Sequence, residues 1–286
     1  MSDATARVRR LARRLADTYV AHSQPRAILL VGSGATGNAD GFSDLDMLLY
    51  YSEPPDEVRL AAARDQFAVE RFRGIPWPDE TGCSERYSID GIQCQLGHAV
   101  IEGWEREIAR VVDDLELDRA LLKQLSGLFE GRPLHGEDLI AQWRLRAAYT
   151  ERLQRAMVEK HWNFFPWWYY EEKLRARDAT VWRYDVLVQS AYDIVGLLAA
   201  LNRVYFSTFE FKRADSFLSR LEVAPPNLPA RLDALFDADE PTSTLELERL
   251  VEETRALVAD RFPDIDLPLE WGGTPTPPGS REAPWM

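Results

Sequence analysis

The stretch VGSGATGNADGFSDLDM, residues 31–47, decides how the first part of the chain folds. It starts at the end of one apolar run, Ala27–Val31, and it leads into a second, Leu45–Tyr51. Apolar runs of this length, bounded by glycine and small polar residues, are typical of buried strands. We therefore predict two strands, joined by a loop rich in Gly, Ser, Asn and Asp over residues 33–43.

Two acidic residues, Asp44 and Asp46, stand at the start of the second predicted strand. Residues i and i+2 of a strand point to the same face, so the two carboxylates lie side by side. Mg²⁺ commonly takes one or two carboxylates, with water and substrate phosphates at its other positions. The Gly32-Ser33 turn adds backbone N–H groups and a hydroxyl that a phosphate can approach closely. Together these features predict a site for a metal-bound nucleoside triphosphate.

The composition limits the partners of the chain. Of its 286 residues, 34 are Lys or Arg and 47 are Asp or Glu, a formal net charge of −13. This acidic balance argues against partners bound by phosphate neutralisation, so nucleic acid is not expected. The two cysteines, Cys83 and Cys94, are too few for a disulfide framework. Apolar stretches such as Ile194–Leu201 are too short for a spanning helix, and a signal peptide is not expected. We expect a cytoplasmic protein without a membrane partner.

The part of the chain before Ile101 mixes helices and strands. Apolar positions at helical spacing predict a helix over 3–22, whose arginines are expected to form a solvated face. These arginines are Arg7, Arg9, Arg10, Arg13 and Arg14. A second helix is predicted over 56–72, and residues 87–96 predict a hairpin with Asp90-Gly91 at its turn.

Beyond Ile101 the patterns become helical. Helices are predicted over 105–115, 118–128, 136–174, 181–205 and 245–261. The expected fold class is α+β, a small mixed-sheet domain followed by an all-helical bundle. We place the first domain at residues 1–116 and the helical domain at 117–262. Residues 263–286 are rich in Pro and Gly, and we expect them to form a disordered tail.

The opening stretch resembles the nucleotidyltransferase signature of the DNA polymerase β-like superfamily. That signature places a glycine turn after an apolar residue, then a gap, here of ten residues, and then two acids around an apolar residue. The matching positions are Val31, Gly32, Ser33, Asp44, Leu45 and Asp46. Among the branches, the chain looks most like bacterial antibiotic nucleotidyltransferases of the lincosamide and aminoglycoside type, whose small mixed-sheet domain precedes a helical domain.

This resemblance implies transfer of a nucleoside monophosphate from a triphosphate, with ATP expected, to a hydroxyl of a small molecule. The acceptor would be an antibiotic or a related metabolite, and pyrophosphate would be released. Mg²⁺ would bridge Asp44 and Asp46 to the phosphates, while Gly32 and Ser33 would hold the triphosphate. Lys212, in a segment similar to a relative's nucleotide-contacting loop, would contact a phosphate; an ordinary surface lysine is the alternative. Homodimer formation stays open.

Many members of the superfamily place a third acid on a later strand. The matching position here is Gln95, with Gln93 as the alternative, and a glutamine neither carries charge to a metal nor acts as a base. We therefore seek the general base elsewhere, at His98 or at Asp185 of the helical domain. The other candidates are Glu85, Asp90, Glu171, Glu172 and Asp193.

Two further alternatives follow from the sequence. The aromatic cluster from Trp162 to Tyr170 would stack a base or a flat substrate, or belong to the core or to a subunit interface. Because Gln95 stands where an acid is expected, the chain is alternatively a catalytically impaired nucleotide-binding module with a regulatory or antitoxin-like role.

Overall fold

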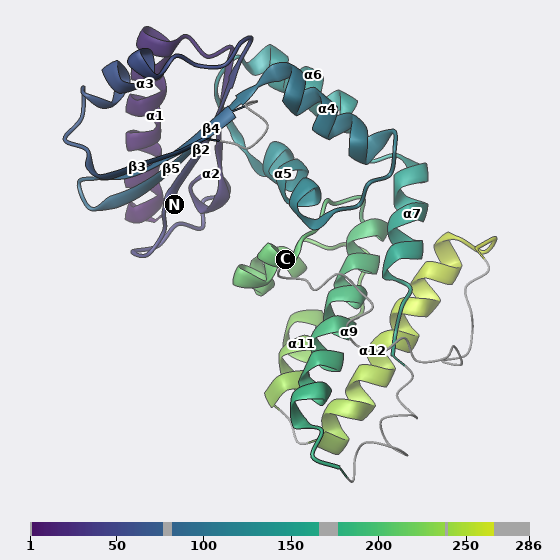
Figure 1. Ribbon diagram of the computed structural model, residues 1–286. Coiled ribbons are helices and arrows are strands. Elements are labelled where there is room, and N and C mark those ends of the chain that lie inside the picture. The colour runs from purple at the N-terminus through teal and green to yellow at the C-terminus, as the bar shows by residue number, and fades with distance from the viewer. Residues whose placement is uncertain (1, 77–81, 166–176, 238–239, 266–286) are drawn as a thin grey trace. The chain divides into compact units, whose positions relative to one another are not determined.

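The computed structural model describes residues 2–76, 82–165, 177–237 and 240–265. Its contacts divide the chain into two compact units, residues 1–148 and 149–286. Figure 1 shows the helices and strands. The first unit contains the sheet and the second contains helices in its described part, which confirms the α+β fold class. Residues 266–286, most of the expected tail, lie outside the described residues.

The sheet of the first unit has six strands in the order β3-β4-β5-β2-β1-β6. Its strands are β1 (Ala27–Val31), β2 (Leu45–Tyr51), β3 (Glu70–Pro76), β4 (Gly82–Ile89), β5 (Ile92–Val100) and β6 (Arg132–His135). Strands β2 and β5 run parallel and the other neighbours antiparallel, so the sheet is mixed. The predicted strands at β1 and β2 and the predicted hairpin, now β4 and β5, are confirmed.

The division between the units differs from the expected boundary near residue 116. Strand β6 pairs with β1 and closes that edge of the sheet, although it lies well beyond the predicted end of the first domain. Leu134 of β6 belongs to the same hydrophobic core as the residues of β1 and β2. The first unit therefore extends to Ala148, because β6 is part of its sheet.

Helices connect and cover these strands. The first unit contains α1 (Asp3–Ser23), α2 (Gly32–Thr36), α3 (Glu57–Arg64), α4 (Ile101–Val112), α5 (Arg119–Glu130) and α6 (Glu137–Arg146). The helix predicted over 56–72 ends at Arg64, and its last predicted residues belong to β3. The glycine-rich stretch predicted as a loop begins with the short helix α2.

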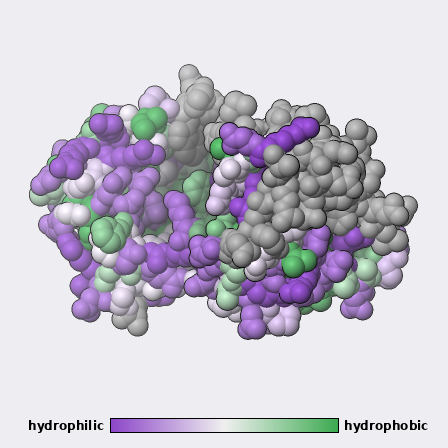
Figure 2. All heavy atoms as spheres, turned by 90° about the horizontal axis from the view of Figure 1, so that it is seen from below, coloured by the Kyte–Doolittle hydropathy of each residue, from purple (hydrophilic) through white to green (hydrophobic). Residues whose placement is uncertain are grey.

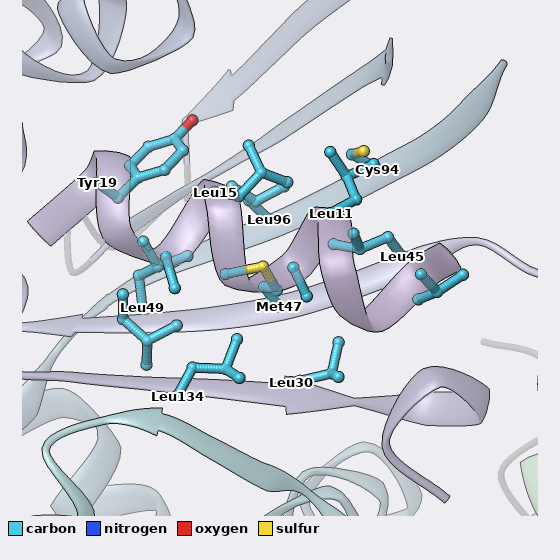
Figure 3. Packing of buried hydrophobic residues seen from close by; sticks show 14 of the residues in the cluster. Leu11, Leu15, Tyr19, Leu30, Leu45, Met47, Leu49, Cys94, Leu96 and Leu134 are labelled. Carbon is cyan, nitrogen blue, oxygen red and sulfur yellow. The ribbon is translucent and has the colours of Figure 1, made fainter. Parts of the chain in front are cut away.

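One face of the sheet packs on α1 and α3. In Figure 3, Leu11 and Leu15 of α1 lie over Met47 of β2 and Leu96 of β5. All four of these side chains are buried. Because side chains alternate along a strand, burial of Met47 directs its neighbour Asp46 to the opposite face. The hydrophobic core thus fixes which face carries the acid pair.

The core face also holds a buried polar network around Glu85, which is 2% exposed. The Tyr19 hydroxyl donates a hydrogen bond to Glu85 Oε2 at 2.6 Å, and His98 Nε2 lies 3.1 Å from the same oxygen. Arg64 forms an ion pair with the other carboxylate oxygen. Burial alone would raise the pKa of Glu85, but His98, Tyr19 and Arg64 outweigh it and hold that pKa below its ordinary value.

The described part of the second unit is helical. It contains α7 (Glu151–His161), α9 (Thr180–Leu201), the 3-10 helix η2 (Thr208–Arg213), α10 (Ala214–Leu218), α11 (Leu228–Asp237) and α12 (Glu240–Arg261). Helix α9 packs against α7, α11 and α12. The helix predicted over 136–174 is interrupted, because α6 ends at Arg146 and Thr150 caps the start of α7.

Helix α9 is long and apolar enough to cross a membrane by length and composition alone. Of its most apolar window, however, 72% is buried inside the structure, as expected for the core helix of a bundle.

Figure 2 shows one face of the molecule, where hydrophilic residues dominate and hydrophobic ones are scattered between them.

Candidate functional site

The acid pair lies at the start of β2. Asp46 is opposite Val31 of β1 on one side and opposite Gln95 of β5 on the other. Asp44 precedes the strand by one residue, and both aspartates are half-buried. The two carboxylates therefore stand at the middle of the sheet, on the face away from α1.

Gly32 brings the Gly32-Ser33 turn against this pair. Its φ of +65° lies in the left-handed region, and a Cβ added there would lie 2.8 Å from Asp46 Oδ2. Only glycine leaves room for the carboxylate at this turn. Ser33 follows in α2, where its hydroxyl makes no hydrogen bond within the described part of the chain. The sequence motif thus becomes a compact group of Gly32, Ser33, Asp44 and Asp46.

Gln95 joins this group from β5. Its Nε2 donates a hydrogen bond to Asp44 Oδ2 at 3.0 Å, and the strand register places it beside Asp46. Gln93, the alternative position, is exposed. An amide at this place orients Asp44 but adds no negative charge.

His98 is not brought to the acid pair. It is fully buried on the core face, with Nδ1 3.1 Å from the Tyr51 hydroxyl and Nε2 3.1 Å from Glu85. Glu85 lies on the same face, so neither group reaches the carboxylates of β2. Asp90 occupies the hairpin turn with a φ of 51°, the role that the tight turn requires.

The remaining candidates lie in the second unit. Asp185 is half-buried on α9. Asp193 is buried, and its Oδ1 lies 3.0 Å from His161 Nδ1. Lys212 is exposed in η2, with Nζ 5.1 Å from the ring centre of Phe209. The roles of Asp185 and Lys212 stay predictions, and Glu171 and Glu172 lie outside the described residues.

Part of the aromatic cluster also falls in the second unit. Phe165 packs edge-on against Trp182 at 4.6 Å between ring centres, and Trp162 lies 6.2 Å from Phe164. These contacts favour a structural role for the described aromatic residues. Residues 167–170 of the cluster lie outside the described part.

Three arginines of the predicted solvated face of α1 donate hydrogen bonds to backbone carbonyls, and one of them, Arg9, contacts α2 beside the site. Arg9 donates hydrogen bonds to the carbonyl oxygens of Gly34 at 2.8 Å and Ala35 at 2.7 Å, both in α2. Arg13 donates to the carbonyl of Leu134 in β6 at 2.8 Å, and Arg7 donates to that of Asp90. The helical periodicity predicted that these residues are accessible, but their carbonyl partners lie far away in sequence.

Sequence reasoning also missed Arg86. This exposed residue of β4 lies directly opposite Gln95, so its side chain shares the face of the acid pair. The signal was present in the sequence, because counting outward from a two-residue turn at Asp90-Gly91 pairs residue 86 with residue 95.

The residues present fit a divalent cation bound by oxygen ligands. Asp44 and Asp46 supply two carboxylates in a half-exposed position, which matches the one or two that Mg²⁺ commonly takes. No group of three or more His, Cys, Asp or Glu that could hold a metal occurs among the described residues. Burial raises the pKa of the nearby Cys94 thiol to about 12, and the charges of Asp44 and Asp46 add to this shift.

Comparisons with known proteins bear on the same segment. Residues 8–78 match the family model of the nucleotidyltransferase domain, a range that includes β1, the Gly32-Ser33 turn and β2. The match supports nucleotidyl transfer as the general class of reaction. One solved structure with similarity to this chain is that of a nucleotidyltransferase-like protein from Exiguobacterium sibiricum 255-15. It is 12% identical, with a TM-score of 0.33, and 87% of this chain and 78% of that chain are covered. No curated protein matches the chain.

Proposed function

We propose that the chain is a Mg²⁺-dependent nucleotidyltransferase that moves a nucleoside monophosphate from a triphosphate to a hydroxyl of a small molecule. The observation that carries the proposal is the grouping of Asp44 and Asp46 beside the Gly32-Ser33 turn. Asp46 Oδ2 occupies the space that a side chain at residue 32 would fill. A triphosphate held by this turn would present its phosphates to both carboxylates.

Asp44 and Asp46 would hold the metal ion. When bound, Mg²⁺ supplies charge neutralisation for the phosphates and helps to align the reacting oxygens. Gln95 keeps Asp44 in position through its amide. The Ser33 hydroxyl donates to the phosphates at the leaving end of the triphosphate.

The reaction balances as a displacement at the α-phosphorus. The acceptor oxygen bonds to the α-phosphorus as the bond to the α,β-bridging oxygen breaks, and pyrophosphate leaves with that electron pair. The hydroxyl proton passes to a base, for which Asp185 stays the candidate of the second unit. We assign His98 to the support of the core face and not to proton transfer, since its ring nitrogens face Tyr51 and Glu85.

We propose ATP as the triphosphate and Lys212 as a contact of its phosphates. The proposed acceptor is an antibiotic or a related metabolite. We further propose a cytoplasmic protein, with a role in antibiotic resistance or in biosynthesis. Dimer formation is tested by measuring the mass of the chain in solution.

The test measures Mg²⁺-dependent binding of ATP and release of pyrophosphate with a panel of hydroxylated acceptors. We expect Asp46→Asn to abolish turnover and to remove the Mg²⁺ dependence of binding, because the amide is a poor ligand for this ion. Asp65→Asn is the matched control, since Asp65 is exposed at the end of α3 on the opposite face. An Asp46→Asn protein with full activity would falsify the assignment of the metal ligand.

A second candidate function is favoured by Gln95. A neutral side chain beside the acid pair suits a module that binds nucleotide without transferring it, as a regulatory or antitoxin-like protein would. Tight Mg²⁺-dependent binding of ATP without pyrophosphate release across the whole panel would favour this alternative.

A further inference from the structure

The face of the sheet beside the acid pair carries exposed arginines. In register across the sheet, Asp46 of β2 is followed by Gln95 of β5, Arg86 of β4 and Arg73 of β3. Residues in register share a face, so these four side chains lie in one line. We call the three that β3, β4 and β5 contribute, Arg73, Arg86 and Gln95, the β3–β5 row. Both arginines are exposed.

The two arginines lie directly opposite each other, which is unfavourable without a counter-charge. Like charges at opposed positions of antiparallel strands destabilise a sheet. Neither Arg73 nor Arg86 has a side-chain hydrogen bond or ion pair within the described part of the chain. On the other face, by contrast, Arg64 contacts both Glu57 and Glu85. The β3–β5 row therefore presents positive charge that the described residues leave unbalanced.

The position of the row relative to the acid pair indicates which ligand it meets. The Gly32-Ser33 turn, which follows β1, lies on one side of Asp46, and the arginines lie on the other side. The attacking and leaving oxygens of a phosphoryl transfer stand roughly in line. If the leaving phosphates lie at Ser33, the acceptor approaches over Gln95 and Arg86. Two strand spacings separate Asp46 from Arg86, or about 10 Å, which a small acceptor spans.

We propose that the acceptor carries an anionic group, most simply a phosphate, which Arg86 and Arg73 bind while its hydroxyl stands at the acid pair. This inference rests on the proposed function, and it narrows the acceptor to a phosphorylated hydroxyl compound. A guanidinium binds phosphate through paired, charge-assisted hydrogen bonds. The same row repels a polycationic amino sugar, so antibiotics of that kind are poor acceptors.

The experiment uses the full chain and separates the two ligands. Binding of ATP is measured first with Mg²⁺, and then inorganic phosphate is titrated into the protein saturated with Mg²⁺ and a non-hydrolysable ATP analogue. A sugar phosphate and the same sugar without its phosphate are compared in the same way. We expect the sugar phosphate to bind more tightly than the sugar by about tenfold or more.

Variants assign the effect to the row. Arg86→Ala should weaken binding of phosphate and of the sugar phosphate by about tenfold, with binding of ATP unchanged. Arg73→Ala should act in the same direction, and Arg59→Ala is the control, since Arg59 is exposed on α3 at the opposite face. Circular dichroism verifies that each variant is folded.

Several results would overturn the inference. Phosphate that does not bind, or that binds equally to the native protein and to Arg86→Ala, contradicts it. Weaker ATP binding in Arg86→Ala would assign the arginine to the triphosphate. Arg86-dependent binding of an oligonucleotide, with none of the sugar phosphate, would replace the small acceptor by nucleic acid. Failure of the proposed function gives a different result. ATP would then bind equally well with and without Mg²⁺, and equally well to the native protein and to Asp46→Asn.

Discussion

At the scale of single residues, Gly32 is the most constrained position of the site. Gly32→Ala adds a Cβ within 2.8 Å of Asp46 Oδ2 at a φ of +65°. We expect the carboxylate to be displaced and Mg²⁺-dependent binding of ATP to weaken by about tenfold to a hundredfold, as when metal ligands lose their support. Calorimetric titration of ATP with and without Mg²⁺ measures this effect.

Gly91 offers the matched control for this substitution. It also has a left-handed backbone, with a φ of +75°, but an added Cβ meets nothing within 4 Å. Gly91→Ala should therefore cost about 1 kcal/mol of unfolding free energy and leave ATP binding unchanged. Equal binding defects in the two variants would show that backbone strain, and not contact with Asp46, explains the result.

At Gln95, the test adds a negative charge to the acid pair. Gln95→Glu replaces the amide that donates to Asp44 by a third carboxylate. Without a cation, like-charge repulsion should lower the melting temperature. Saturating Mg²⁺ should then raise it by more than in the native protein, because a more negative site binds the ion more tightly.

The control for this prediction lies two residues earlier on β5. Gln93 shares the face of Gln95 but is exposed and lies before the register position of Asp46. Gln93→Glu should show a smaller response to Mg²⁺ in the same thermal scan. A response as large as that of Gln95→Glu would mean that charge anywhere on this face is sufficient.

At the scale of elements, the Glu85 network joins strands β4 and β5 to helices α1 and α3. Glu85→Gln would leave Arg64 without its buried partner and weaken the contact with Tyr19. Breaking one side of a buried ion pair costs about 3–5 kcal/mol. We expect chemical denaturation to show a loss of this order. Glu102→Gln, at an exposed pair with Arg106, should change the unfolding free energy by less than about 1 kcal/mol.

The same network predicts a dependence of stability on pH. The pKa of Glu85 is held below its ordinary value of 4.5 in the folded state, so the unfolded chain binds the proton more readily. The stabilisation is present above the unfolded pKa and is lost as the pH falls from about 4.5 through the folded pKa. In Glu85→Gln this part of the acid-induced loss should be absent. An unchanged pH profile would contradict the assignment of Glu85 as a paired carboxylate.

The elements that the sequence predicted are those with a strong burial pattern. Strands β1 and β2 are almost continuously apolar, and the hairpin has a turn signal, so their positions followed from the residues alone. Strand β3 is exposed along its whole length, and its first three residues fall within the helix predicted over 56–72. Strand β6 has four residues and includes a proline, which is too little for a period to emerge. Strands β3 and β6 are the two edges of the sheet. They form because they pair with β4 and β1, and not because their own residues have a strand pattern.

The candidate site shows the same limit. The acid pair and the turn are adjacent through β1 and β2, so their grouping was predictable. Gln95 and His98 are three positions apart on β5, and strand alternation alone directs them to opposite faces. That rule alone argues against His98 as the base. The contacts of Arg9 with α2, in contrast, depend on tertiary packing that no local signal reveals.

At the scale of the whole molecule, net charge and local charge point to different partners. A chain with a formal charge of −13 repels polyanions in general, yet the β3–β5 row is locally positive. A small phosphorylated acceptor is compatible with both the negative net charge and the positive row. It needs only the local field of the row, and it presents little charge to the rest of the surface.

The division of the chain yields the last prediction. The six strands, the acid pair and the core around α1 all lie within residues 1–148. A protein of residues 1–148 should therefore unfold cooperatively and keep the Mg²⁺ dependence of ATP binding, although with lower affinity because the phosphate contact proposed for Lys212 is removed. Ending the chain at residue 116 removes β6 and uncovers the hydrogen-bonding edge of β1, and it also removes Leu134 from the core.

An uncovered, apolar strand edge pairs with other chains, so the shorter protein should aggregate. Size-exclusion chromatography and thermal unfolding of the two truncated proteins decide between the boundaries. If residues 1–116 stay monomeric and unfold as cooperatively as residues 1–148, then β6 is an accessory of the sheet. The mixed sheet would in that case be complete at the boundary that the sequence predicted, and the acid pair would need no support from α5, β6 or α6.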